Sequence, residues 1–261
     1  DESTYLCLAK PARRANPGVT LHIGDAMRAH IAGVSDEHPG ARVVRFEATD
    51  GDVEGAIDTA GTAPLPPYIR TRLDDPGRYQ TVYADGKAES AAAPTAGLHF
   101  TERAISSLRE RGVAWTAVQL EVGLATFVPI RATTLDAHVM HQERCTVSQK
   151  TADAVDVTRR QGGRVIAVGT TVVRTLESHT TATGALWAGS HDTSLYITPG
   201  FRFRVVDGLL TNFHQPRSSL LALLAAFVGA DRWRMAYDHA LVHGYRFLSF
   251  GDCMLCWRRD A

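Results

Sequence analysis

The feature that most limits the fold is the alternation of strand-like and helix-like segments after residue 62. Helices are expected at residues 101–111, 151–161, 170–178, 218–228 and 232–243, and strands at residues 115–122, 164–168, 194–197, 203–206, 245–250 and 254–257. Strands that alternate with helices form a sheet that is covered by helices. The pattern therefore predicts an α/β domain with a mixed sheet over residues 62–261.

Residues 1–61 have a different, β-rich pattern. Short apolar runs at residues 5–8, 19–23 and 41–47 have the spacing of strands, and turn residues separate them. So few strands are too small a set to close a barrel or a sandwich alone. The proline-rich residues 62–68 mark the boundary, and we expect a small, incomplete β-barrel-like domain at 1–61 beside the α/β domain at 62–261.

Composition argues against several classes of protein. The 28 basic and 28 acidic residues balance, which gives no support for a strongly basic nucleic-acid binder but allows a local basic patch. No apolar run approaches the roughly 18 residues of a membrane span. Four cysteines do not make a disulfide framework, and the CxxC of Cys253 and Cys256 has an apolar, strand-like setting that favours structural cysteines. A reducing, cytoplasmic location is expected.

Residues 92–100 suit neither a good helix nor an ordinary strand. Pro94 removes a backbone donor, and Gly97 permits dihedral angles that other residues avoid. A rigid loop of this kind can present the hydroxyl of Thr95 and the imidazole of His99 to a ligand. Taken alone, the segment favours a surface turn over a site.

The sequence Gly169-Thr170-Thr171 stands between an apolar strand and a helix. N–H groups at the start of a helix bind phosphate or carboxylate groups, and threonine hydroxyls add donors. The segment lacks the lysine of a P-loop and the glycines of a dinucleotide fingerprint. An anion site and an ordinary threonine N-cap are equally compatible with it.

Two histidine-containing segments are further candidates. On a strand, His141 and Glu143 would share a face, which suits an imidazole oriented by a carboxylate; a structural pair and a zinc site are the alternatives. Residues 209–219 are expected to form a polar loop before an apolar helix. Asn212 and His214 have no capping role in that loop, so they are expected to face a ligand.

An arginine and a tyrosine complete the candidates. Arg246 lies inside an expected strand, where an arginine usually pairs with a carboxylate or an anionic ligand. Tyr83 follows the proline-rich boundary and would either stack on a base or belong to the core.

Together these segments match one pattern, which runs from about residue 64 to the end of the chain. The matching blocks are PLPPYI at 64–69, RYQTVYA at 78–84, AAPTAGLHF at 92–100, HVMHQE at 138–143, VGTT at 168–171 with RTLE at 174–177, PGFRF at 199–203, DGLLTNFH at 207–214 and YRFLSFGD at 245–252. The chain resembles the S-adenosylmethionine:tRNA ribosyltransferase-isomerase family, which makes epoxyqueuosine in tRNA. Residues 1–60 resemble this family only in length and β character.

The resemblance implies a reaction in which S-adenosylmethionine donates its ribosyl group rather than its methyl group. The implied acceptor is the aminomethyl group of 7-aminomethyl-7-deazaguanine in the tRNA anticodon loop. Adenine and methionine leave, and the ribose is rearranged into an epoxycyclopentane. This chemistry needs a base beside the sulfonium and an acid near the departing adenine. The family also implies a monomeric cytoplasmic enzyme, S-adenosylmethionine as co-substrate, no metal, and catalysis in residues 62–261.

The matching blocks carry the expected site residues. His99 or His214 would be the base, and His141 with Glu143 would be the acid pair. The methionine carboxylate is expected to bind Gly169, Thr170, Thr171 and Arg174. The purine is expected to pack on Tyr83, Phe100 and Phe213. Other substrate contacts are expected from Thr95, Asn212 and Arg246.

The chain departs from the family pattern in three places. The family has an Asn-Asp-Thr-Arg-like block ahead of the β-rich unit, and this sequence has no counterpart, so it is either truncated or lacks part of the site. Glu121 and Ala125 stand where the family has histidine and glycine, and Val172 stands where it has serine. Two alternatives therefore stay open: a paralogue that uses S-adenosylmethionine on another acceptor, and a non-catalytic S-adenosylmethionine- or nucleoside-binding protein.

Overall fold

The computed structural model describes residues 3–36, 38, 40–62, 65–71, 73–84, 90, 92–122, 140 and 142–259. The chain forms two compact units, Asp1–Arg72 and Leu73–Ala261. Within the described ranges, none of the helices has both the length and the apolar character that crossing a membrane requires.

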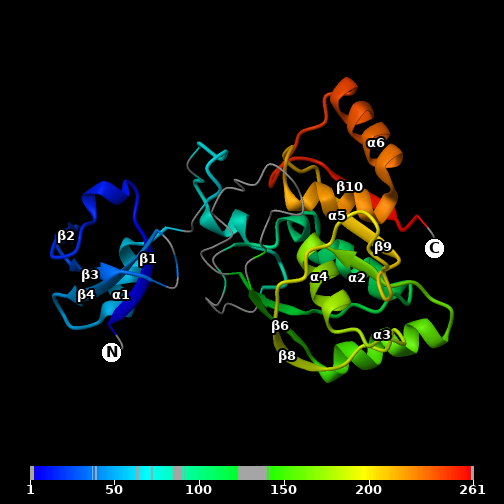
Figure 1. Ribbon diagram of the computed structural model, residues 1–261, viewed down its shortest axis with the longest axis horizontal. Helices are drawn as coiled ribbons and strands as arrows, with labels where there is room; N and C mark the ends of the chain where they lie inside the picture. The colour runs from blue at the N-terminus through cyan, green and yellow to red at the C-terminus, as the bar shows by residue number, and fades with distance from the viewer. Residues whose placement is uncertain are drawn as a thin grey trace. The chain divides into compact units, whose positions relative to one another are not determined.

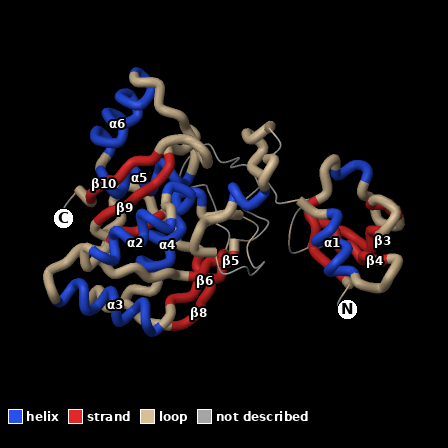
Figure 2. Tube along the Cα trace, turned by 180° about the vertical axis from the view of Figure 1, so that it is seen from behind, coloured by secondary structure: helices blue, strands red, loops and turns tan. Residues whose placement is uncertain are grey.

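In the residues that the structure describes, the first unit is a four-stranded antiparallel sheet with one α-helix. Its strands are β1 (Thr4–Leu8), β2 (Thr20–Ile23), β3 (Met27–Val34) and β4 (Ala41–Ala48), in the order β1-β4-β3-β2. Helix α1 (Val53–Ala60) packs on β4 (Figure 2). In the part of this unit that the structure describes, β1 and β2 are two unpaired edges, so the expected barrel-like closure is not found.

Three of these strands match the expected apolar runs, whereas β3 and α1 were not expected. On β3 the buried positions are Met27, Ala29 and Ile31, which alternate with Arg28 and His30. Alanine is only weakly apolar, so Ala29 makes the alternation of apolar and polar residues hard to see in the sequence. It nevertheless lies on the buried face, where the strand packs. Helix α1 was not expected because it is short and lies among turn-forming residues. The Asp52 carboxylate caps its N-terminus.

Over its described residues, the second unit contains two three-stranded sheets and five α-helices. Strands β5 (Gln119–Glu121), β6 (Glu143–Val147) and β8 (Gly189–Thr193) form an antiparallel sheet in the order β5-β6-β8. Strands β7 (Ile166–Val168), β9 (Gly208–Asn212) and β10 (Cys253–Trp257) form the order β10-β9-β7. Because β9 is antiparallel to β10 and parallel to β7, this sheet is mixed, and the α/β class with a mixed sheet is confirmed.

The α-helices described in this unit begin after capping or glycine residues. They are α2 (Glu102–Glu110), α3 (Gln149–Arg160), α4 (Thr170–Ser178), α5 (Ser219–Val228) and α6 (Ala230–Val242), with short 3₁₀ turns η1 (Ala12–Arg14), η2 (Pro76–Tyr79) and η3 (Thr95–His99). The hydroxyls of Thr101 and Ser218 accept backbone N–H groups at the starts of α2 and α5. Gly229, with φ +91°, separates α5 from α6.

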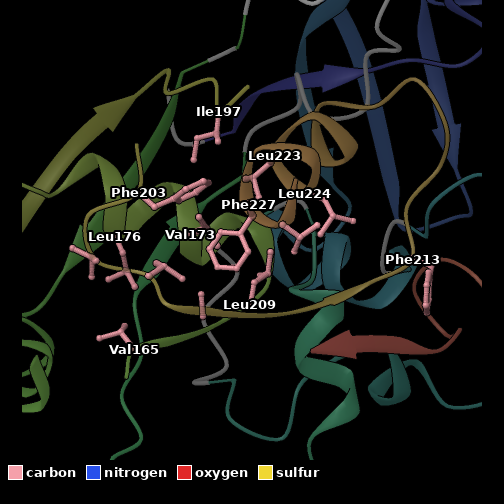
Figure 3. Close-up of a cluster of buried hydrophobic side chains, with 14 of the residues drawn as sticks. Val165, Val173, Leu176, Ile197, Phe203, Leu209, Phe213, Leu223, Leu224 and Phe227 are labelled. Atoms are coloured by element: carbon pink, nitrogen blue, oxygen red, sulfur yellow. The ribbon is translucent and has the colours of Figure 1, made fainter. Parts of the chain in front are cut away.

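The core of the second unit lies between the mixed sheet and helices α4 and α5. Helix α5 packs against β10 and α6, and α4 packs against β7, β9 and β6 (Figure 1). Phe227 is fully buried and lies among Val173, Leu209 and Leu223 (Figure 3). Full burial of each such side chain contributes about 1.5–3 kcal/mol, so this cluster fixes α4 and α5 on the sheet.

Three expected strands are not strands. Residues 203–206 pair with no strand: the backbone N–H groups of Arg204, Val205 and Val206 instead donate to the buried carboxylate of Glu177, at 2.9, 3.0 and 3.0 Å. The strand expected at 194–197 is wrong because the pairing lies earlier, at β8. Along residues 204–206, the Glu177 carboxylate thus accepts the backbone N–H groups that a neighbouring strand would otherwise bind.

The strand expected at 245–250 is also wrong. Leu248 has a φ of +72°, in the left-handed region, and a β-strand cannot pass through that conformation. Asp252 closes the resulting turn, since its carboxylate accepts the N–H of Arg246 at 2.7 Å while its own N–H donates to the Arg246 carbonyl. Conversely, residues 209–212 were expected in a loop and form β9 at the centre of the sheet.

Candidate functional site

Three segments that are distant in sequence meet at one edge of the mixed sheet. Strands β7 and β9 are parallel and pair Val168 with Leu210, so their carboxyl ends lie together. Gly169 follows β7, and its N–H donates to the Leu210 carbonyl at 2.8 Å. The turn η3 contacts β9, and a Cβ on Gly169 would lie 3.7 Å from Cβ of Ala96. The start of α4, the end of β9 and η3 therefore form one site, which we call the sheet-edge site.

Asn212, at the end of β9, connects these segments. Thr95 Oγ1 donates to Asn212 Oδ1 at 3.1 Å. Asn212 Nδ2 lies 2.9 Å from Nε2 of His99 and donates to the Leu248 carbonyl at 3.3 Å. The amide side chain is 3% exposed and so makes these contacts in a nearly dry environment.

The contacts of Asn212 determine the tautomer of His99. The Leu248 carbonyl can only accept, so the atom of Asn212 that faces it must be the amide nitrogen. The same nitrogen faces His99 Nε2, which must therefore accept, and the ring proton lies on Nδ1. Burial lowers the pKa of His99, with a smaller opposing effect of the Asp252 carboxylate. At neutral pH the His99 ring is therefore neutral and offers Nδ1–H as a donor.

His214 lies beyond β9 in a more shielded position. Its Nε2 is 2.8 Å from the hydroxyl of the buried Thr211, and its backbone N–H donates to the Tyr237 hydroxyl at 2.7 Å. Burial lowers the pKa of His214 to about 4. The adjacent Phe213 is 3% exposed and packs against Tyr237, Tyr245 and Phe247, so its ring belongs to the core.

The start of α4 has free backbone donors. Its N-cap is Gly169, with φ +97°, and no side chain caps the first turn, so the threonine N-cap considered from the sequence is wrong. Thr170 and Thr171 are the first helical residues. Uncapped N–H groups at a helix start carry partial positive charge and suit an anion.

Arg174 lies one helical turn after this start and is nearly buried. It forms an ion pair with Glu143 on β6, and its Nε donates to the Leu195 carbonyl at 3.0 Å. Its other terminal nitrogen, Nη2, is buried and has no hydrogen-bond partner among the described residues. The side chain therefore keeps one unused donor group for an anion.

An aromatic cluster adjoins η3. The Trp115 ring meets the rings of Tyr83 and Phe100 edge to face, with centroids 5.6 and 5.0 Å apart. Gly97 does not have a left-handed φ, so the expected conformational reason for this glycine is wrong. A Cβ at Gly97 would instead overlap the Tyr83 hydroxyl and approach Cγ2 of Thr81.

Substituting Gly97→Ala is expected to lower the free energy of unfolding by about 1–3 kcal/mol, because the added methyl group overpacks the contact with Tyr83. Urea unfolding followed by tryptophan fluorescence measures this, since the four tryptophans all lie after residue 72. Ser106→Ala is the control, because Ser106 is exposed on α2 in the same unit and its removal should change the free energy of unfolding by less than about 0.5 kcal/mol. An equal effect of both substitutions would contradict the close-approach explanation.

The structure brings some of the predicted residues together and separates others. Thr95, His99 and Asn212 meet directly, and Glu143 meets Arg174 rather than a described histidine. His141 lies outside the described residues, and so does Ala125, which stands where the family has glycine. Arg246 is exposed and follows a turn rather than a strand.

Sequence reasoning missed three contributors to the site: Asp252, the Leu248 carbonyl and Trp115. Leu248 acts through its backbone, and no sequence pattern marks such an acceptor. The sequence predicts Trp115 in a strand. Its place in the site becomes visible only through its contact with Tyr83, which lies more than 30 residues earlier in the sequence. From the sequence, Asp252 is expected only to pair with Arg246 or to lie in a turn. In the structure its carboxylate closes the turn.

Comparisons with known proteins place the chain in a family. Residues 1–256 match the sequence model of a family described as queuosine biosynthesis protein. A protein of Moorella thermoacetica named S-adenosylmethionine:tRNA ribosyltransferase-isomerase is 47% identical over 253 residues, which are 97% of this chain and 73% of the relative. A protein of the same name from Heliobacterium modesticaldum is 48% identical, over 95% of this chain and 72% of its own length.

A solved structure agrees with these sequence matches. The crystal structure of the S-adenosylmethionine tRNA ribosyltransferase of Thermotoga maritima is similar with a TM-score of 0.51 and 33% identity. The similarity covers 98% of this chain and 71% of that protein. On these grounds, the chain belongs to the queuosine biosynthesis protein family.

Proposed function

We propose that this protein transfers the ribosyl group of S-adenosylmethionine to the 7-aminomethyl-7-deazaguanine of a tRNA and isomerises it, which forms epoxyqueuosine and releases adenine and methionine. The observation that carries the proposal is the match to ribosyltransferase-isomerases at 43–48% identity over nearly the whole chain. The sheet-edge site supports it, since it combines neutral imidazoles with anion donors.

The proposed roles follow from the chemistry of each group. A base must remove a proton beside the positively charged sulfur, and only a neutral imidazole can accept it. Burial lowers the pKa values of His99 and His214, so both rings are neutral at pH 7. Asn212 occupies Nε2 of His99, which in this arrangement acts as a donor through Nδ1, whereas Nδ1 of His214 has no partner among the described residues.

The methionine carboxylate would bind at the start of α4. The uncapped N–H groups after Gly169 and the unused Nη2 of Arg174 offer complementary donors for a carboxylate. Tyr83 and Phe100 would contribute to the wall against which the purine packs. In this proposal Glu143 fixes the orientation of Arg174, and His141 is assigned as the acid.

The direct test is incubation of the purified protein with S-adenosylmethionine and a tRNA that carries the aminomethyl precursor. Mass spectrometry of the digested nucleosides should show epoxyqueuosine, with one adenine and one methionine released for each modified tRNA. Two controls should give neither product: a tRNA with guanine at that position, and S-adenosylhomocysteine, which lacks the sulfonium charge.

The same experiment separates the remaining alternatives. Adenine release without a change in tRNA mass would mean that the ribosyl group goes to another acceptor. Glu121 on β5 and the zero net charge of the chain are the reasons to test for this outcome. Calorimetric binding of S-adenosylmethionine without any turnover would indicate a binding protein.

A further inference from the structure

Three metal-binding side chains that are not assigned to the reaction come together on β8 and on β6 and α4, the elements that also carry Glu143 and Arg174. They are Cys145 on β6, His179 at the end of α4 and His191 on β8, and one ligand atom of each lies within 4.8 Å of the others. Cys145 and His191 are directly opposite in the antiparallel β6–β8 pair. No sequence pattern predicts this cluster, because its members are 34 and 12 residues apart and match no local motif.

The distances suit a tetrahedral metal ion. Sγ of Cys145 lies 3.7 Å from Nδ1 of His191, and this nitrogen lies 3.3 Å from Nε2 of His179. Zinc binds thiolate sulfur at about 2.3 Å and imidazole nitrogen at about 2.0–2.1 Å, which separates tetrahedral ligand atoms by about 3.3–3.6 Å. All three ligand atoms lie within 4.8 Å of one another, so an ion would draw the widest pair together by up to about 1 Å.

Each ring nitrogen of His179 faces a backbone carbonyl. Its Nδ1 lies 2.9 Å from the Thr175 carbonyl and its Nε2 lies 3.1 Å from the Gly189 carbonyl. Both carbonyls only accept, whereas a neutral imidazole has a single N–H. When Nδ1–H donates to Thr175, as the outer contact of a metal-bound histidine does, the lone pair of Nε2 is left for a metal.

The surroundings of the cluster are shielded but accessible from one side. Cys145 and His179 are fully buried, and the Trp187 ring packs on the rings of His179 and His191 with centroids 4.3 and 4.9 Å apart. His191 is only partly buried and lies on β8, an edge strand of the described sheet. Of the three ligands, His191 is therefore the one that solvent reaches.

We propose that Cys145, His179 and His191 form a binding site for a zinc-type divalent ion, with water as the fourth ligand. A thiolate with two neutral imidazoles is a donor set that zinc prefers. The ion would join β6, β8 and the end of α4, and so would have a structural role that is independent of the proposed ribosyl transfer.

The test measures zinc binding by the metal-free full chain in competition with a chromophoric chelator. One equivalent of Zn²⁺ should bind, and Cys145→Ser and His191→Ala should each weaken binding at least about 10-fold. With Co²⁺ as the probe, the unchanged chain should show a thiolate-to-cobalt band in the near ultraviolet that Cys145→Ser removes. Cys256→Ser, which changes a cysteine on β10 outside the cluster, should retain both signals.

Either of two results would overturn the proposal. Absence of saturable zinc binding would mean that the three side chains form only a hydrogen-bonded cluster. Equal zinc affinity of the His191→Ala variant and the unchanged chain would place the metal elsewhere. His191 is partly exposed, so this variant should fold, and circular dichroism checks that it does. None of these readouts needs ribosyl transfer, so their failure is distinguishable from failure of the proposed function.

Discussion

Replacing Asn212 by alanine is expected to reduce kcat/KM for adenine release by on the order of 10²-fold, the loss that a misplacement of about 1 Å in a catalytic site can cause. The substitution takes away the acceptor for Thr95 and the donor for both His99 and the Leu248 carbonyl. The His99 ring then loses the contact that fixes its tautomer. Adenine release, measured at several concentrations of S-adenosylmethionine, separates the change in kcat from the change in KM.

A second variant distinguishes orientation of His99 from simple loss of packing. Asn212→Asp keeps the shape of the side chain but can no longer donate, so Nε2 of His99 must carry the proton to remain hydrogen-bonded. Nitrogen chemical shifts of the His99 ring should report the Nδ1–H tautomer in the unchanged protein and the Nε2–H tautomer in the variant. Asn16→Ala, a change in the first unit, serves as the control for activity. Full activity of Asn212→Ala would exclude the bridge from the mechanism.

Replacing Glu177 by alanine is expected to lower the free energy of unfolding by about 3–6 kcal/mol. The carboxylate accepts three backbone N–H groups, and each buried donor that is left without a partner costs about 1–3 kcal/mol, less where water enters. Such a loss is a large fraction of the total stability of a typical domain. Equilibrium unfolding in urea measures it.

Two comparisons make this result specific. Glu177→Gln keeps one acceptor oxygen, so its loss should be about half that of Glu177→Ala. Glu110→Ala removes an exposed glutamate at the end of α2 and should change stability by less than about 0.5 kcal/mol. If Glu177→Ala unfolds at nearly the same urea concentration as the unchanged protein, the carboxylate does not hold residues 204–206.

Local features of the fold could be predicted from the sequence because local physics decides them. Helix α4 begins after Gly169, where only glycine tolerates the positive φ, and its apolar face follows the helical period. The same holds for α5, whose start is capped by Ser218. Strand β9 was missed because Thr211 and Asn212 are polar, yet both are nearly fully buried at the centre of the sheet.

The candidate site was predictable as a set of residues but not as an arrangement. The blocks that resemble a known family pointed to His99 and Asn212 separately, although they are 113 residues apart and bond directly. Their contact depends on the parallel pairing of β7 with β9, and no local signal encodes that pairing. Phe213 illustrates the converse, since a block residue that was expected to contact substrate packs in the core.

The cluster of Trp115 with Tyr83 and Phe100 also makes the site optically observable. Indole emission changes with the surroundings of the ring, and both neighbouring rings are in contact with it next to η3. Energy absorbed by the Tyr83 phenol passes efficiently to an indole whose centroid is 5.6 Å away. A ligand that packs on Tyr83 or Phe100 would therefore lie beside an intrinsic fluorophore, so that its binding and release could be followed in real time without a label.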